Sequence, residues 1–469
     1  MSLVAPVPNT AQDDARMNPQ GPGVRWTIWL LVAVSMAFPV LPDTFTMNAM
    51  GPELTHSVVE GSLKRQIVFG SLFLGAALLA WRCRGSVLRN LRGMNIFLPL
   101  VVLYCLVSAA WSPYPEVTMK RTFIVMVLFL IGVAVAPPTG MTRQVGRITM
   151  GAYTLILVIS FFVVLIDPGI GVDYALGDAW RGITWQKNTL GSIAGFAALF
   201  YLREAAMQPQ YRGRYVAGLL FCMFMLVMSK SATSMLCLAV SAGIYLVVRR
   251  RHVGGRHAEA IVVLAGVVAA LFALLLFYVV LGRMPTPKDL IAPVTALFNK
   301  SADLTGRDQI WDLVDLSIQR HPLLGIGYSA FWTGTGGPSQ YIADKLGWMP
   351  AHAHNGFLDI INDMGQVGFG LFMACLLWHL YSILRLARMD REDAAMHLGI
   401  CVAIIISNFS ESQLLRDSAF QNALFIYSVV AVGARLAMAR SATRTVPGAS
   451  LAAPSRLPAW TAQGGGPGR

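Results

Sequence analysis

The sequence predicts an all-α integral membrane protein with about twelve transmembrane helices, and three observations support this fold class. Apolar residues make up 55% of the 469 residues, and charged residues only 13%. Apolar stretches close to the ~20 residues that a membrane-spanning helix needs recur along most of the chain. The basic residues lie in small clusters between these stretches, as expected where charge encodes membrane orientation. The net charge of +13 is therefore dispersed, which argues against a nucleic-acid partner.

Twelve apolar segments are candidates for membrane-spanning helices. In chain order they are 26–42, 66–82, 96–111, 122–138, 148–166, 189–202, 215–229, 232–248, 260–281, 365–384, 394–409 and 418–434. Several are shorter than ~20 residues, so we expect their ends to extend into the flanking turns. The segments 189–202 and 215–229 show the weakest pattern.

The two ends of the chain differ in composition from the membrane domain, which we expect to span residues 25–438. Residues 1–24 form a polar lead, which we interpret as disordered and not as a cleavable signal. Residues 439–469 are rich in Ala, Pro, Gly, Ser and Arg, so we expect a disordered tail. The six cysteines show no CxxC or metal-type spacing, so we expect neither a disulfide framework nor a metal site based on cysteine.

The distribution of basic residues predicts the orientation. If the N-terminus is cytoplasmic, 23 of the 37 Lys and Arg residues fall on the cytoplasmic side, although the longest loop lies on the other side. Positive residues concentrate on the cytoplasmic side of membrane proteins. We therefore expect both termini in the cytoplasm and the loop 282–364 outside. A second, shorter outer loop is 167–188.

The long outer loop contains two patterns typical of amphipathic helices. Residues 289–300 place five apolar side chains on one helical face, and Thr305 is a plausible N-cap for a helix through Arg320. In the second helix, Trp311, Val314 and Ile318 fall together. We expect both helices to lie on the outer leaflet. A surface helix with no further role gives the same pattern.

Two closely spaced histidines, His352 and His354, are the strongest candidates for proton transfer in this loop, because histidine titrates near neutral pH. One alternative is a helix through both histidines. The other, which we prefer, has Asn355 as the N-cap of a helix, with His354 just before it and free to turn into a cleft. Metal binding needs further ligands at suitable spacing, so we expect no metal. A pair of solvated loop histidines remains the plain alternative.

Several cations lie on the predicted outer face, against the general trend. An anionic partner such as a phosphate would explain them, with Arg offering paired donors and Lys a point charge. Snorkelling to lipid headgroups is the alternative for any one of them. Lys230 is the sharpest case, because it lies in a tight turn between two apolar segments. The candidates for anion binding are Arg121, Arg181, Lys187, Lys230, Arg307 and Arg320.

Aromatic residues and one further histidine complete the set of candidates. Five of the eleven tryptophans lie in the two longest outer loops, where they could stack on sugars or anchor the loops at the membrane interface. These are Trp180, Trp185, Trp311, Trp332 and Trp348. His379 lies within an apolar segment, and we expect it to hydrogen-bond to a neighbouring helix.

Four motifs together resemble the O-antigen ligase and polymerase superfamily of the Wzy and WaaL type. They are WRGITWQKNTLGS, MSKSAT, TGRDQIW followed by HPLLGIGYSAFW, and HAHNGFLDIINDMGQVGFGLF. The KNTLG form and the chain length look most like the ExoQ-like exopolysaccharide polymerases. Each motif alone is weak, but their order and spacing are fairly specific. By motif the resemblance covers residues 180–411.

The resemblance implies a bacterial inner-membrane enzyme with a GT-C-like architecture and its active site on the periplasmic side. Such proteins transfer a glycan from undecaprenyl diphosphate to an acceptor sugar hydroxyl, without a metal or another cofactor. His354, with Asn355, matches the essential histidine of the family, and Arg307 matches its loop arginine. Lys230 stands where relatives often have arginine. The donor site would also include His352, Asn355 and the other outer cations, and a chain-length regulator and export machinery would be partners.

Two other functions stay open at this stage. A ligase that moves the polymer onto lipid A core or another acceptor would share the donor motifs. A polysaccharide transporter or flippase would carry related halves and ionisable residues in the middle of the membrane. No repeat between the two halves is visible, and His379 is the main intramembrane candidate.

The charge distribution makes a prediction about topology. In a cysteine-free background, a membrane-impermeant maleimide should label a cysteine at position 340 in intact cells but should not label one at position 253. Labelling in the reverse pattern would contradict the orientation that the basic residues predict.

Overall fold

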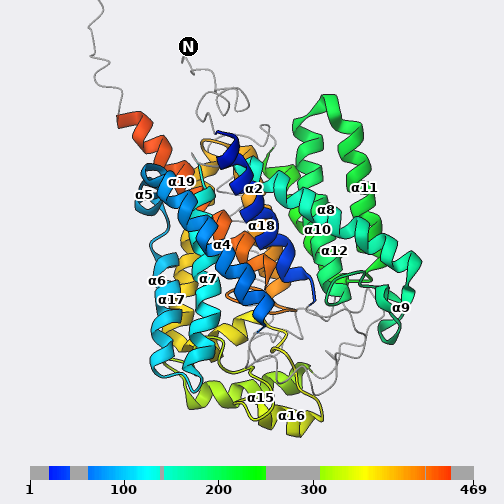
Figure 1. The fold of residues 1–469 in the computed structure, drawn as a ribbon, viewed down its shortest axis with the longest axis vertical. Coiled ribbons are helices and arrows are strands. Elements are labelled where there is room, and N and C mark those ends of the chain that lie inside the picture. The colour runs from blue at the N-terminus through cyan, green and yellow to red at the C-terminus, as the bar shows by residue number, and fades with distance from the viewer. Residues whose placement is uncertain (1–20, 43–61, 138–141, 250–306, 418, 445–469) are drawn as a thin grey trace, which may run out of the picture.

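The computed structural model describes residues 21–42, 62–137, 142–249, 307–417 and 419–444, and it is almost entirely helical (Figure 1). The exception is a two-stranded antiparallel ladder in which β1 (Val172–Asp173) pairs with β2 (Ala179–Trp180). This agrees with the predicted all-α class. The predicted amphipathic helix at 289–300, the Thr305 cap and the apolar segment 260–281 lie outside the described residues.

The first half of the described chain contains ten helical elements. They are α2 (Pro22–Ala37), η1 (Phe38–Val40), α4 (Leu63–Arg82), α5 (Arg84–Gly93), α6 (Phe97–Val107), η2 (Ser108–Ala110), α7 (Pro115–Val135), α8 (Thr142–Ile166), α9 (Pro168–Gly171) and η3 (Tyr174–Leu176). Those of the second half are α10 (Lys187–Met207), η4 (Pro209–Tyr211), α11 (Arg212–Met228), α12 (Ala232–Val248), α15 (Arg307–Arg320), α16 (Gln340–Leu346), α17 (Gly356–Ala387), α18 (Arg391–Asn408) and α19 (Phe420–Arg444).

Eleven of the twelve predicted apolar segments coincide with helices, including the two weak ones, which form α10 and α11. Within the described ranges, seven helices are long and apolar enough to cross a membrane, and the pair α5 and α6, bent by 94°, would make an eighth. The chain is therefore a multi-pass membrane protein. The helices α10, α12 and α18 do not pass this test, and α12 has only 17 residues. The number of about twelve spans stays a prediction.

The last helix forms the centre of the bundle, because 78% of its most apolar window is buried. It contacts α2, α5, α7, α17 and α18. His379 of α17 lies 3.0 Å from the hydroxyl of Ser428 on this helix, so the expected bond to a neighbouring helix is confirmed. All six cysteines are free, as expected.

The long helix α17 is broken at Gly365, where the backbone has a φ of 62°. Residues of the segment before α16 fill the break: the amides of Gln366 and Val367 donate to the carbonyls of Pro322 and Leu323. In return, the amides of Ile326 and Gly327 donate to carbonyls on α17. A Cβ on Gly325 would lie 2.4 Å from the nitrogen of Gly365, so both positions require glycine. Broken helices are tolerated in membranes where protein groups pair the freed backbone.

The helices α15 and α16 lie across one end of the bundle (Figure 1). They share a small apolar core with the segments before and after α16, separate from the core of the bundle; its buried members are Ile310, Leu313, Val314, Phe331, Trp332, Ile342 and Ala353. The predicted apolar face of α15 is confirmed, since Val314 is buried and Trp311 and Ile318 pack against this core. The face therefore packs on protein and not, as expected, on a lipid leaflet. This end of the molecule carries the polar residues singled out in the sequence.

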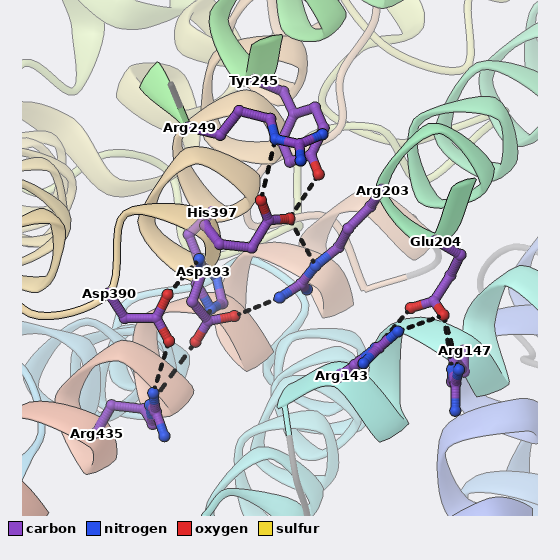
Figure 2. A network of polar contacts seen from close by, with 11 residues as sticks. Arg143, Arg147, Arg203, Glu204, Tyr245, Arg249, Asp390, Asp393, His397 and Arg435 are labelled. Carbon is purple, nitrogen blue, oxygen red and sulfur yellow. Dashed lines mark hydrogen bonds and ion pairs between the residues drawn. The ribbon is translucent and has the colours of Figure 1, made fainter. Parts of the chain in front are cut away.

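A network of charged residues lies at the helix ends opposite α15 (Figure 2). Arg203 of α10 is 2.9 Å from the carboxylate of Asp393 on α18, and both side chains are 6% exposed. Arg435 of α19 pairs with Asp390, which precedes α18. On α8, Arg143 pairs with Glu204 of α10. These contacts tie four helices together where the apolar spans end.

The burial of the Arg203–Asp393 pair predicts a large effect of breaking it. Removing one partner of a buried pair costs ~3–5 kcal/mol, whereas an exposed pair contributes ~0–1 kcal/mol. Arg203→Met should therefore lower the thermal unfolding midpoint of the purified protein by several degrees. The control is Lys120→Met, which breaks the exposed pair with Glu116 and should leave the midpoint almost unchanged. Equal midpoints for the two variants would contradict this role of Arg203.

Candidate functional site

The carboxylate of Glu411, which follows α18, brings the candidate residues together. Its Oε2 lies 3.4 Å from Nδ1 of His354 and 3.5 Å from Nε2 of His352. Its Oε1 lies 3.8 Å from the guanidinium of Arg307, the first residue of α15. Glu411 is only 7% exposed, whereas His354 is 23% exposed and can be reached from outside. The structure thus places three predicted residues around one buried acid.

A second set of contacts links Glu411 to the turn that contains Lys230. Asn188, in the first turn of α10, donates from Nδ2 to Glu411 at 2.8 Å. The hydroxyl of Ser231 donates to Oδ1 of Asn188 at 3.1 Å. Lys230 itself is exposed and donates to the carbonyl of Gly177 in the shorter outer loop at 2.6 Å. The turn between α11 and α12 therefore belongs to the same cluster as the histidines.

The backbone between His352 and α17 fixes the direction of both imidazoles. Asn355 caps α17, as predicted, since its side chain accepts from the amides of Phe357 and Leu358. His354 has a φ of 52°, in the left-handed region that non-glycine residues seldom adopt. Its amide donates to Nδ1 of His352 at 3.0 Å, so a neutral His352 carries its proton on Nε2, toward Glu411. The preferred sequence interpretation, a cap at Asn355 with His354 before the helix, is confirmed.

Asp359 of α17 anchors the loop that carries His352 and His354. Its carboxylate accepts from the indole of Trp332 at 2.8 Å, from the amide of Ala353, which lies between the two histidines, and from the hydroxyl of Ser412. Ser412 is the neighbour of Glu411. The indole of Trp311 adds a bond to the carbonyl of Ala353 at 2.8 Å. Two of the tryptophans singled out in the sequence, Trp311 and Trp332, thus position the histidine loop.

The charges around the cluster determine the protonation of its members. Burial raises the pKa of Glu411, but the contacts with His354, Arg307 and Asn188 outweigh burial and bring the pKa below its ordinary value. Burial, and then electrostatic repulsion from Arg416, His354 and Arg307, hold the pKa of His352 well below its ordinary value. At neutral pH, Glu411 is therefore a carboxylate and His352 is neutral.

His352, His354 and Glu411 offer ligand atoms within 4.8 Å of one another, a spacing that could hold a metal ion. The surroundings fit an anion better. The guanidinium of Arg307 already contacts the carboxylate, and Arg416 donates to the carbonyl of Ala351 beside the histidines. Two guanidinium groups beside three potential ligands repel a divalent cation and attract a phosphate.

The other predicted anion-binding residues lie around the cluster at different distances. Lys187 is the first residue of α10, next to Asn188. Arg181 donates to the carbonyl of Ile170 within its own loop at 2.9 Å. Arg121 of α7 contacts Ser329 and so supports the segment before α16. Arg320 lies at the other end of α15 from Arg307, about 20 Å away along a helix of this length, and is not part of the cluster.

Three residues of the cluster were missed in the sequence: Glu411, Asn188 and Arg416. Glu411 and Arg416 lie in the short connection between α18 and α19, which shows no motif on its own. Two features of the sequence point to Glu411 and Arg416. Glu411 is an acid directly after an apolar segment on the predicted outer face, and Arg416 is an outer cation that breaks the same charge rule as Arg307.

The fold and the cluster define a class: a multi-pass helical membrane protein with a histidine, carboxylate and arginine site at one end of the bundle. Residues 217–373 match the model of the O-Antigen ligase family. The chain is 27% identical to the exopolysaccharide production protein ExoQ of Rhizobium meliloti over 366 residues, which covers 74% of this chain and 78% of ExoQ. The resemblance that the motifs predicted is confirmed: the chain is similar to the O-antigen ligase family and to ExoQ.

The contacts of Asp359 predict that it positions the histidine loop. In Asp359→Ala, the indole of Trp332 and the amide of Ala353 lose their acceptor. Each unpaired buried group costs ~1–3 kcal/mol, so the unfolding midpoint should fall and the loop of residues 351–355 should exchange its amide hydrogens faster. Asp344→Ala is the matched control, because Asp344 accepts a bond on the exposed side of α16. Unchanged exchange in Asp359→Ala would refute this positioning role.

Proposed function

We propose that this protein is a glycan polymerase of the bacterial inner membrane that acts on the periplasmic side in exopolysaccharide synthesis. It transfers an oligosaccharide from undecaprenyl diphosphate to a hydroxyl of an acceptor sugar. The similarity to ExoQ over most of both chains supports the polymerase assignment. The observation that carries the proposal is the meeting of His354 and Arg307 at one buried carboxylate, Glu411.

In the proposed reaction, His354 is the general base. The acceptor O–H gives its proton to the imidazole as the oxygen attacks the anomeric carbon of the donor sugar. The bond between that carbon and the diphosphate oxygen breaks, the configuration inverts, and undecaprenyl diphosphate leaves as an anion. Glu411 faces Nδ1 of His354, where it can orient the ring and stabilise the imidazolium that forms. The left-handed backbone at His354 is a strained conformation of the kind found at functional sites.

The cations hold the diphosphate of the donor in this proposal. Arg307 and Arg416 border the histidines, and Lys230 is joined to the cluster through Ser231 and Asn188. Positive groups already in place at the leaving group lower the barrier without reorganisation. Neither a metal ion nor another cofactor is required for this step. Arg181, in the loop before α10, and Lys187, the first residue of α10, complete the cationic border.

A ligase that transfers finished polymer to lipid A core or another acceptor is the second candidate. The family model that matches residues 217–373 is described as an O-Antigen ligase, which favours this reading. The two reactions share the donor chemistry and differ in the acceptor. Loss of the gene separates them: a polymerase mutant accumulates single repeat units on the carrier lipid, and a ligase mutant accumulates full-length polymer there.

Purified protein with lipid-diphosphate-linked oligosaccharide tests the site directly. His354→Ala should lower the rate of polymer formation by ~10²–10⁴-fold, the usual contribution of a general base. Arg307→Ala should also lower it strongly, because Arg307 faces both the diphosphate and Glu411. The product would be separated by length on a gel.

Two variants at neighbouring positions serve as controls. Arg320→Ala removes a cation from the far end of the same helix as Arg307, and His321→Ala removes an exposed histidine. Both should retain wild-type rates. Polymer formation at the wild-type rate by His354→Ala and Arg307→Ala would exclude the proposed site.

A further inference from the structure

A polar cavity lies at the opposite end of the bundle from His354. Its volume is about 620 Å³, and its lining residues are Arg147, Met150, Gln208, Gln210, Tyr211, Arg214 and Tyr215. The helix α10 shows the separation: it begins beside Asn188 of the candidate site and ends at Met207, next to the cavity. A helix of 21 residues is about 30 Å long, so the two sites lie at opposite ends of the bundle.

The chemistry of the lining favours an anion. Two guanidinium groups and two side-chain amides border the cavity, and none of its lining residues is acidic. Arginine presents several N–H donors in a plane that matches the oxygens of a phosphate. The volume is in the range of about 300–1,000 Å³ that is usual for small-molecule sites.

The side chain of Arg147 is held by a buried carboxylate. Its Nε and Nη2 atoms donate to Oε2 of Glu204 at 2.9 and 2.8 Å (Figure 2). Glu204 is 3% exposed and also pairs with Arg143. Arg147 is 42% exposed, so part of its guanidinium remains open. A buried carboxylate that immobilises one side of an arginine leaves its remaining donors preorganised for a ligand.

Arg214 is held by a different contact. Its guanidinium carbon lies 5.8 Å from the ring centre of Tyr211 and 5.4 Å from that of Tyr215. Within the described residues no carboxylate pairs with it. The hydroxyl of Tyr215 donates to Oε1 of Gln208 at 3.3 Å, so the side-chain nitrogen of Gln208 takes no part in this bond. Arg214 is therefore positioned while its charge is not neutralised by an acid.

We propose that this cavity is a binding site for a phosphate-bearing ligand, separate from the histidine site. The phosphate would contact Arg147 and Arg214, and the aromatic rings and Met150 would contact the part attached to it. At the end of the membrane spans, the phosphate can come from an anionic lipid headgroup of the adjacent leaflet or from a soluble phosphorylated compound. The proposal does not depend on glycan transfer, since it rests on the cavity alone.

Binding of two probes to the purified full-length protein distinguishes the sources. Phosphatidic acid is compared by native mass spectrometry with diacylglycerol of the same chains, which lacks the phosphate. Inorganic pyrophosphate is titrated calorimetrically. We expect Arg214→Gln to weaken one probe about tenfold or more, corresponding to about 1.4 kcal/mol. Weaker retention of phosphatidic acid identifies a lipid site, and weaker binding of pyrophosphate identifies a soluble ligand.

The matched control is Arg212→Gln. Arg212 is an exposed arginine in the same turn of α11, and it does not line the cavity. Its substitution removes the same charge as Arg214→Gln and should change neither affinity. Arg147→Gln provides a second variant, with its fold checked by size-exclusion chromatography. Equal affinity of wild type, Arg214→Gln and Arg147→Gln for both probes would overturn the proposal, as would an equal loss in Arg212→Gln.

Discussion

The arrangement of the candidate site depends on one buried negative charge. Glu411 is nearly inaccessible, and a carboxylate in such a place is stable only when cations and donors surround it. This need is met by His352, His354, Arg307 and Asn188. The two histidines come from one turn with a constrained backbone, and Arg307 and Asn188 come from two other parts of the chain. The acid therefore organises the site, although a sequence search for histidine and arginine motifs does not reveal it.

A second carboxylate supports the first. Asp359 lies one helical turn beyond the Asn355 cap and binds the backbone between the two histidines as well as Ser412, the neighbour of Glu411. The histidine loop and the connection after α18 are thus tied to one rigid helix. Such fixed surroundings matter for chemistry, because a catalytic group contributes fully only when its geometry is held in advance. The strained backbone at His354 persists because these contacts over-determine it.

Hydropathy predicted most of the fold, since eleven of the twelve apolar segments are helices, and the cap at Asn355 followed from a local change of pattern. Local signals also identified His354 and Arg307. The contacts between them could not be predicted, because Glu411 reaches the cluster from 57 residues beyond His354 in the chain and no periodicity encodes that approach. Arg320 shows the limit of a local signal: it shares a helix and a charge with Arg307, but the length of α15 separates them.

The break in α17 has a consequence for how relatives of this protein can be recombined. The segment 322–327 and the broken part of α17 complete each other's hydrogen bonds, and two glycines allow them to touch. Main-chain hydrogen bonds therefore join the segment 322–327 to α17, and the segment is not a removable module. Chimaeras that exchange this loop between relatives would need to carry both the segment 322–327 and the broken part of α17, because a foreign loop would leave main-chain groups of α17 unpaired.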